Sequence, residues 1–449
     1  MDSPEPIIAP EDSRFLEREG LLSEATNNKR KISTVLTTPP TSDTSRSSSS
    51  SSGASTTSAI SRVTFAGKEV ESIEIPTHIE SATTYEWLGF TAAKAAELYQ
   101  WFTEVPDDDQ LKDFYYVAEF QLTWSKVEDA YTESDDWRAC MDGLGINQTL
   151  QDAILNPEYE EIRFTQSCKF WLLDTMGDKY SFLLDMPERI RDGTATMHSI
   201  RERAKRRKPA ASFSQSSSLA TPATPPQAGD DSGVSMPTSS ATPSAPAVAT
   251  TVETPLSLPG HTTLWRAGTL SGATSFYDIA TQKIDLYAIS MSPGDFCGPI
   301  RRTYWTPQKE TAERYARFAM SRKDFEPAAI LQVFVPDSFL ATLKIAEVWF
   351  GDDWKKLIWA SRKIKEFPPE LQELESSDVL VGHVASGINN KFTKLKGPEL
   401  IKERALLMVC IGGEWKRAVQ WVFQSAKARQ GFERECRGKV YIHRIGPIP

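Results

Sequence analysis

The sequence lacks the features of a secreted, membrane-spanning or metal-binding protein. The chain begins with MDSPEPIIAPEDS, which has neither a basic nor an apolar segment, so we expect no signal peptide. No run approaches the roughly 20 apolar residues that a membrane helix needs. The five cysteines are widely spaced and form no CxxC pair, which favours reduced thiols over a disulfide framework or a zinc site. These absences predict a nuclear or cytoplasmic protein outside the membrane.

The common catalytic motifs are missing as well. The sequence contains no P-loop, no GxGxxG after a predicted strand, no GxSxG and no HExxH. Its five histidines are scattered along the chain, so we expect no metal site. The net charge of −9 disfavours nucleic-acid binding, although it leaves room for a local basic patch.

Composition divides the chain into four parts. Residues 1–75 include a serine run at 47–52, and residues 201–260 are dominated by Ser, Thr and Pro after a short basic run. Such segments bury too little apolar surface to offset the entropy lost on folding. We therefore predict a disordered N-terminal arm and a disordered linker. The aromatic-rich segments 76–200 and 261–449 are predicted to fold.

The residues of the first folded segment have helical spacing. Thr91 is placed to cap a helix whose apolar residues recur every three or four positions, and Asp107–Asp109 would begin a second helix. A third helix would end before Pro157. The aromatic-rich stretch that follows is predicted to form one helix before Gly177 and another after it. We find no catalytic group of residues here and expect a packing or interaction module.

The second folded segment has the residue pattern of strands rather than of helices. It contains short stretches rich in β-branched and aromatic residues, which are separated by turn formers. Two helical stretches lie among them, ETAERYARFAMSR and DDWKKLIWASRKIKEF. Strands with scattered helices and no regular βαβ rhythm predict an α+β fold with a mixed, mainly antiparallel sheet.

An ordered series of short motifs in this segment carries the candidate site. In chain order they are LWRAG at 264–268, GDF at 294–296, YWT at 304–306 followed by a predicted helix from Glu310, the stretch Trp354–Arg362, a predicted strand ending in Gly382, and QWVF at 420–423. This order resembles the ADP-ribosyltransferase-like superfamily over about residues 262–432, and within it a group of bacterial domains of unknown function. In the first module, YEWLGF at 85–90 is similar to a block found in uncharacterised fungal proteins.

The resemblance implies that the second module binds NAD. Arg266 would offer the phosphates a planar, always charged fork, and Thr306 would orient the nicotinamide ribose. Tyr304 or Trp305 could stack on the nicotinamide ring. From the residues alone, Arg266 could instead pair with a surface carboxylate, and the two aromatic residues could alternate between core and surface. The implied cofactor-binding residues are Trp265, Arg266, Gly268, Tyr304 and Thr306.

The sequence departs from the family at the catalytic position. The resemblance implies a glutamate on a late strand that stabilises an oxocarbenium-like sugar, but the matching residue is Ala426, with Gln424 nearby. Loss of that charge would lower the rate by on the order of a hundredfold or more. Two hypotheses follow: an NAD- or ADP-ribose-binding domain, active or decayed, and a non-enzymatic nuclear or cytoplasmic adaptor. The catalytic candidates are Gln420, Gln424 and Glu435, with Glu414 and Glu433 as further nearby carboxylates.

The densest positive run of the chain lies where the first module meets the linker. Runs of this kind are recognised by nuclear import receptors or attract phosphate groups, and cations also favour the C-terminal end of a helix. We predict an import signal or a cationic helix end here, and the sequence specifies no other protein partner. The run consists of Arg201, Arg203, Lys205, Arg206, Arg207 and Lys208.

Overall fold

The computed structural model describes most of the chain in ten segments. The serine run at 47–52, the predicted helix start at Asp107–Asp109, Arg207 and Lys208 lie outside them. The described segments are residues 6–37, 61–65, 68–106, 113–131, 135–206, 255–291, 294–323, 325–363, 365–386 and 395–445.

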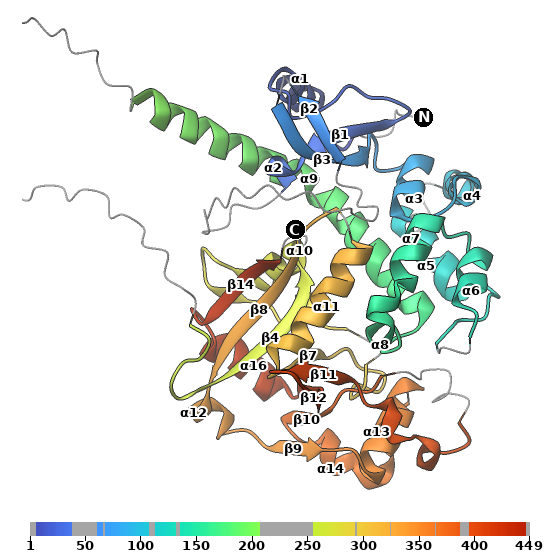
Figure 1. Cartoon of the computed structure of the whole chain (residues 1–449), viewed down its shortest axis with the longest axis vertical. Coiled ribbons are helices and arrows are strands. Elements are labelled where there is room, and N and C mark those ends of the chain that lie inside the picture. The colour runs from blue at the N-terminus through green and yellow to red at the C-terminus, as the bar shows by residue number, and fades with distance from the viewer. Residues whose placement is uncertain are drawn as a thin grey trace, which may run out of the picture.

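The N-terminal region folds against the longest helix of the molecule, α9 (Cys168–Arg206) (Figure 1). Its three strands form an antiparallel sheet in the order β1-β3-β2. Ile32 and Ile73 of this sheet share one buried cluster with Phe182 and Met186 of α9. The elements are α1 (Pro10–Arg18), β1 (Lys29–Ser33), α2 (Thr34–Thr37), β2 (Ser61–Phe65) and β3 (Lys68–Pro76).

The prediction of a disordered arm over residues 1–75 does not hold for 6–37, 61–65 and 68–75. These stretches contain few apolar residues, and composition alone therefore indicated that they could not fold. The structure gathers those residues on one side and covers them with α9, which supplies the apolar surface that the segment lacks.

Helices form the next part of the chain, as the residue spacing predicted. Thr91 is confirmed as a helix cap, because its hydroxyl accepts a hydrogen bond from the backbone N–H of Lys94 at 3.3 Å. Asp113 caps the following helix in the same way. The helices are α3 (Ala82–Leu88), α4 (Ala92–Glu104), α5 (Phe114–Trp124), α6 (Trp137–Gly143), α7 (Gln148–Leu155) and α8 (Glu160–Arg163), with a 3-10 turn at Pro157–Tyr159.

Helix α9 is continuous over 39 residues, so the predicted break at Gly177 is wrong. A glycine costs a helix only about 1 kcal/mol, which tertiary packing can offset. Packing is extensive here. Met176 is buried in the helical module, whereas Met186 is buried against the N-terminal sheet. Arg201–Arg206 lie at the C-terminal end of this helix and are therefore not part of a linker.

The C-terminal module has the predicted α+β architecture with mainly antiparallel sheets. One sheet has the order β14-β8-β4 and the other β7-β13-β10-β9, in which only β9 and β10 are parallel. Two small hairpins, β5-β6 and β11-β12, complete the described strands. The strands are β4 (His261–Thr269), β5 (Tyr277–Asp278), β6 (Lys283–Ile284), β7 (Thr303–Trp305), β8 (Ala328–Pro336), β9 (Ile345–Val348), β10 (Val379–His383), β11 (Met408–Ile411), β12 (Glu414–Arg417), β13 (Val419–Phe423) and β14 (Val440–Ile445).

Helices cover these sheets. Helix α11 lies across β4 and β8, where Ala312 and Ala316 pack against Trp265 and Ile330 (Figure 1). None of the described helices is both long and apolar enough to cross a membrane. The helices of this module are α10 (Leu270–Phe276), α11 (Lys309–Arg322), α12 (Asp337–Leu340), α13 (Asp352–Arg362), α14 (Gln372–Glu375) and α16 (Ala426–Glu435), with 3-10 turns at Tyr287–Ile289, Pro369–Leu371, Pro398–Leu400 and Glu403–Ala405.

The two sheets meet at the edges of β4 and β7. Trp265 and Thr306 exchange backbone hydrogen bonds of 2.7 and 2.9 Å and form an isolated bridge between the sheets. No other strand pairing joins the two sheets in the described part of the chain, although side chains of both share one hydrophobic cluster. A junction with a single bridge leaves room for side chains of both strands to face a common space.

The helical and C-terminal modules share a hydrophobic core. Phe318 of α11 and Val384, Leu407 and Val409 belong to the same buried cluster as the helices α3–α9. The sequence presented the modules as two folding segments with a linker between them, but the structure packs them directly against each other. The site described next lies at their junction.

Candidate functional site

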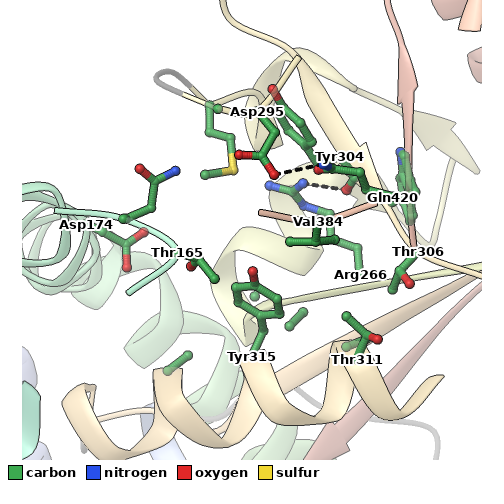
Figure 2. A pocket seen from close by; sticks show the side chains of 18 of the residues that line it. Thr165, Asp174, Arg266, Asp295, Tyr304, Thr306, Thr311, Tyr315, Val384 and Gln420 are labelled. Atoms are coloured by element: carbon green, nitrogen blue, oxygen red, sulfur yellow. Dashed lines mark hydrogen bonds between the residues drawn. The ribbon is translucent and has the colours of Figure 1, made fainter. Parts of the chain in front are cut away.

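A cavity of about 200 Å³ opens where the two sheets meet, and α11 and the start of α9 form its other walls (Figure 2). Strands β4 and β7 contribute the residues that the motif series singled out. All five implied cofactor-binding residues line this one cavity: Trp265, Arg266, Gly268, Tyr304 and Thr306. The helical module contributes Thr165, Gln166, Phe170, Trp171 and Asp174 to the opposite wall.

Arg266 is a half-buried cation in this cavity. Its guanidinium donates hydrogen bonds to the carbonyl oxygens of Tyr304, at 2.7 Å, and Ile289, at 2.6 Å. No described Asp or Glu forms a salt bridge with it, so the alternative of a surface ion pair does not hold. Burial lowers the pKa of Arg266 to about 10, which still leaves it charged at neutral pH. A half-buried positive charge without a paired carboxylate attracts an anionic ligand.

The residues of the YWT motif lie in different surroundings, some at the cavity and one mainly in the core. Thr306 lines the cavity, and its hydroxyl accepts a hydrogen bond from the backbone N–H of Gln308 at 3.2 Å. Trp305 packs between Phe276 and Phe432 in the core, although one edge reaches the cavity. A ring so placed is unavailable for stacking on a nicotinamide, which leaves Tyr304 as the aromatic candidate of this motif.

The phenol of Tyr304 is held in place by the backbone of the GDF motif. Its phenolic oxygen accepts a hydrogen bond from the backbone N–H of Phe296 at 3.2 Å, and burial raises its pKa well above the ordinary value. A Cβ on Gly294 would lie 2.2 Å from this oxygen. Glycine is therefore required at position 294, and the GDF motif supports the tyrosine of the YWT motif.

Asp295 and Arg362 form a buried ion pair that the sequence analysis did not assign to the site. Each side chain is only 3% exposed, and the guanidinium donates to Oδ1 of the carboxylate. Oδ2 accepts hydrogen bonds from the backbone N–H of Ala385 at 2.7 Å and from Nε2 of Gln420 at 2.8 Å. Arg362 also donates to Oε1 of Gln166 at 3.0 Å. The GDF motif was the available signal for Asp295, and the motif series included the stretch Trp354–Arg362 on α13 without assigning a role to Arg362.

The three catalytic candidates lie in different places. Gln420 lines the cavity, but its amide is occupied by Asp295 and by the carbonyl oxygen of His383 at 3.0 Å. Gln424 lies outside the cavity, where its Nε2 donates to the carbonyl oxygen of Ser377 at 2.8 Å. Glu435 ends α16 and pairs with Arg434 of the same helix at 2.8 Å. The structure thus brings only Gln420 to the predicted site.

The catalytic glutamate that the resemblance implies has no counterpart in the cavity. Ala426 is the first residue of α16, and the hydroxyl of Ser425 caps that helix. The two carboxylates that line the cavity, Asp174 and Asp295, are both engaged with cations. No described carboxylate is therefore placed to stabilise a developing positive charge on a ribose.

The ionisable side chains of the cavity leave a positive surplus. Four cations and two carboxylates line it, and Asp178, just behind the lining, also pairs with Lys323, which leaves one excess positive charge. The carboxylate of Asp174 forms ion pairs with two of these cations, Arg322 at 3.0 Å and Lys323 at 2.8 Å. The four cations are Arg266, Arg322, Lys323 and Arg362.

Asp174 makes the junction between the modules sensitive to acid. Burial alone would raise the pKa of Asp174, but the charges of Lys323 and Arg322 outweigh it and lower the pKa to about 2. A depressed carboxyl pKa contributes stability that is present above the unfolded value, about 3.9, and is lost as pH falls through the folded value. We therefore expect unfolding free energy to fall between about pH 4 and pH 2 more steeply in the wild type than in Asp174→Asn. Urea titrations across this range measure the difference, and Asp353→Asn, at an exposed carboxylate of α13, should keep the wild-type slope.

Among the described residues, no group of three or more His, Cys, Asp or Glu side chains is placed to hold a metal ion. Comparison with protein-family models, curated proteins and solved structures finds no match to this chain.

Proposed function

We propose that the cavity binds NAD or ADP-ribose, and that residues 261–449 are an ADP-ribosyltransferase-like domain that has kept ligand binding and lost transferase activity. The observation that carries the proposal is the convergence of Arg266 and Thr306. These residues are far apart in the sequence, were singled out together by the order of the motifs, and line one cavity.

The charge of the cavity supports an anionic ligand. Arg266 has no carboxylate partner among the described residues, and the cations of the lining outnumber the carboxylates that pair with them by one, Arg266 itself. The two carbonyl oxygens that accept hydrogen bonds from Arg266 fix the plane of its guanidinium. A planar cation held in this way is suited to a phosphate, which it can bind through two parallel N–H donors.

The volume limits which part of the ligand is enclosed. Pockets that enclose drug-sized ligands measure about 300–1,000 Å³, whereas this cavity measures about 200 Å³. It has room for one end of a dinucleotide and not for the whole molecule. The remainder of the ligand would lie in the mouth of the cavity, beside the start of α9.

Calorimetric titration of the full chain with NAD tests the proposal. We expect NAD and ADP-ribose to bind and to raise the melting temperature. A ligand at a hundredfold excess over its Kd adds about 2.7 kcal/mol to the free energy of unfolding. Arg266→Met should abolish binding because it removes the phosphate donor, and Thr306→Val should weaken it. Arg301→Met is the matched control, because this arginine is exposed and does not line the cavity.

Two results would contradict the proposal. Absence of any binding at millimolar NAD would exclude a dinucleotide site, and equal affinity in Arg266→Met would exclude this cavity. Thr306→Val keeps the test decisive if Arg266→Met fails to fold, because its backbone bridge to Trp265 is retained. Release of nicotinamide above background would show that the domain is an active enzyme.

A second candidate function, the non-enzymatic adaptor, is favoured by a different observation. The helical module carries a group of exposed aromatic rings on its surface, and none of these rings lines the cavity. Large exposed apolar patches of soluble proteins commonly mark protein-binding surfaces.

A further inference from the structure

Helices α4 and α5 expose a continuous row of aromatic side chains. Trp101 is 36% exposed, Phe120 38% and Trp124 70%. Their rings contact one another in sequence, with centroid distances of 5.3 Å from Trp101 to Phe120 and 6.4 Å from Phe120 to Trp124. Tyr116 extends the row, because its ring centroid lies 6.0 Å from that of Phe120.

The spacing explains why these rings face solvent together. Tyr116, Phe120 and Trp124 recur every four residues and therefore lie on one face of α5. The opposite face buries Phe114, Ala118 and other apolar residues in the helical core. The aromatic row is thus not part of the core that stabilises the module.

Carboxylates surround this row. Glu97 and Glu104 lie four residues before and three residues after Trp101 on α4, and Asp113 and Glu119 lie three residues on either side of Tyr116. No described Lys or Arg forms an ion pair with Glu104, Asp113 or Glu119. Over residues 92–128 the sequence has eight acidic and three basic side chains, a net charge of −5. We name these four rings and four carboxylates the acidic aromatic surface.

An aromatic face with adjacent carboxylates is suited to arginine and lysine. A cation above an aromatic ring is attracted to the electrons of its face, and nearby carboxylates add ion pairs. Among the described residues no cation occupies this position over Trp101, Tyr116, Phe120 or Trp124.

The chain carries a segment of matching charge. Residues 201–208 have six basic side chains and one acidic one, a net charge of +5 against the −5 of residues 92–128. Residues 201–206 form the end of α9, which projects from the body on the side opposite α4 and α5 (Figure 1). Within one chain the two charged regions are therefore held apart.

We propose that the acidic aromatic surface of one copy binds the basic run 201–208 of a second copy. The contact joins two different surfaces, so it is a head-to-tail contact that can extend to further copies. It uses exposed charges and should therefore be weak and sensitive to salt. It does not depend on the proposed nucleotide site, because neither region lines the cavity.

Sedimentation velocity of the full chain tests the proposal. At about 50 mM salt the average mass of the wild type should rise with protein concentration, and about 500 mM salt should weaken association on the order of tenfold by screening. Phe120→Ser/Trp124→Ser and Lys205→Glu/Arg206→Glu should each be monomeric. An equimolar mixture of these two double variants retains one functional surface of each kind, and we expect it to form dimers and no larger species.

The controls distinguish this contact from non-specific association through exposed aromatic side chains. Trp415 is 63% exposed on β12, so Trp415→Ser removes a comparable ring elsewhere and should associate like the wild type. Glu104→Lys/Glu119→Lys tests the same surface through its charge if the serine variant does not fold. A monomeric wild type at all concentrations, a monomeric mixture, or wild-type association in either surface variant would each overturn the proposal.

Discussion

Replacing Asp295 with alanine should lower the free energy of unfolding by about 3–5 kcal/mol, because the Arg362 guanidinium then remains buried without its counterion. The same change leaves the backbone N–H of Ala385 and the amide of Gln420 without their acceptor. Each of these groups is buried, so water does not replace the lost hydrogen bonds at little cost. Urea denaturation followed by tryptophan fluorescence measures the loss.

A double variant shows whether the stability lost in Asp295→Ala comes from the unpaired charge of Arg362 or from the space left by the missing side chain. Asp295→Ala/Arg362→Met removes both charges, so it should be more stable than Asp295→Ala alone. Asp353→Ala removes an exposed carboxylate from α13, the helix that carries Arg362, and should change stability by no more than about 0.5 kcal/mol. If the double variant is less stable than Asp295→Ala, the assignment of the ion pair as the dominant interaction is incorrect.

Replacing Arg322 with alanine should cost about 2–4 kcal/mol, because this side chain joins the two modules. It is 2% exposed and donates to Asp174 at 3.0 Å and to the hydroxyl of Thr175 at 2.6 Å. Its guanidinium also lies 4.5 Å from the ring centroid of Trp171 and 4.4 Å from that of Phe318. Truncation therefore removes packing and hydrogen bonds from both sides of the junction.

The exposed Arg317 on the same helix provides the control. Arg317→Ala removes a similar but exposed side chain from α11 that makes no salt bridge among the described residues and only a charge interaction with Tyr159, so it should change stability by no more than about 0.5 kcal/mol. Hydrogen exchange adds a local readout. We expect Arg322→Ala to increase exchange in α11 and in the start of α9 together, whereas faster exchange in α11 alone would contradict a role in joining the modules.

Local patterns in the sequence predicted the secondary structure well. Thr91 caps its helix as expected, since capping depends on a hydroxyl and a backbone N–H three residues apart. Apolar stretches of the second module became strands, and the absence of a βαβ rhythm correctly indicated antiparallel pairing. These features depend on neighbours within a few residues, which a single sequence displays.

Long-range packing was not visible in the sequence. The N-terminal sheet buries its apolar residues against α9, a contact that composition does not show, so composition wrongly indicated disorder for residues 6–37, 61–65 and 68–75. Gly177 did not break α9, because contacts with two separate cores keep this helix continuous. In both places the deciding contact comes from a segment far away along the chain.

The candidate site was predicted in part. From the order of the motifs we predicted that Arg266 and Thr306 share one site, and both line the cavity. Gln424 and Glu435, which we also named as candidates, do not line it. The motif series included the stretch that ends at Arg362, but it did not predict that Arg362 pairs with Asp295, because a basic residue near the end of a helix normally faces solvent. It also gave no sign that the helical module forms one wall, since that wall depends on how the two modules pack.

The shared wall has a consequence for how this protein can change in evolution. A chain reduced to residues 261–449 would expose Phe318, Val384 and Leu407 to water and leave the cavity open along one side. Recombination could therefore not transfer either half to another protein without destroying both the fold and the cavity. We expect the pair to be inherited as one unit, with the segment between them free to vary in length.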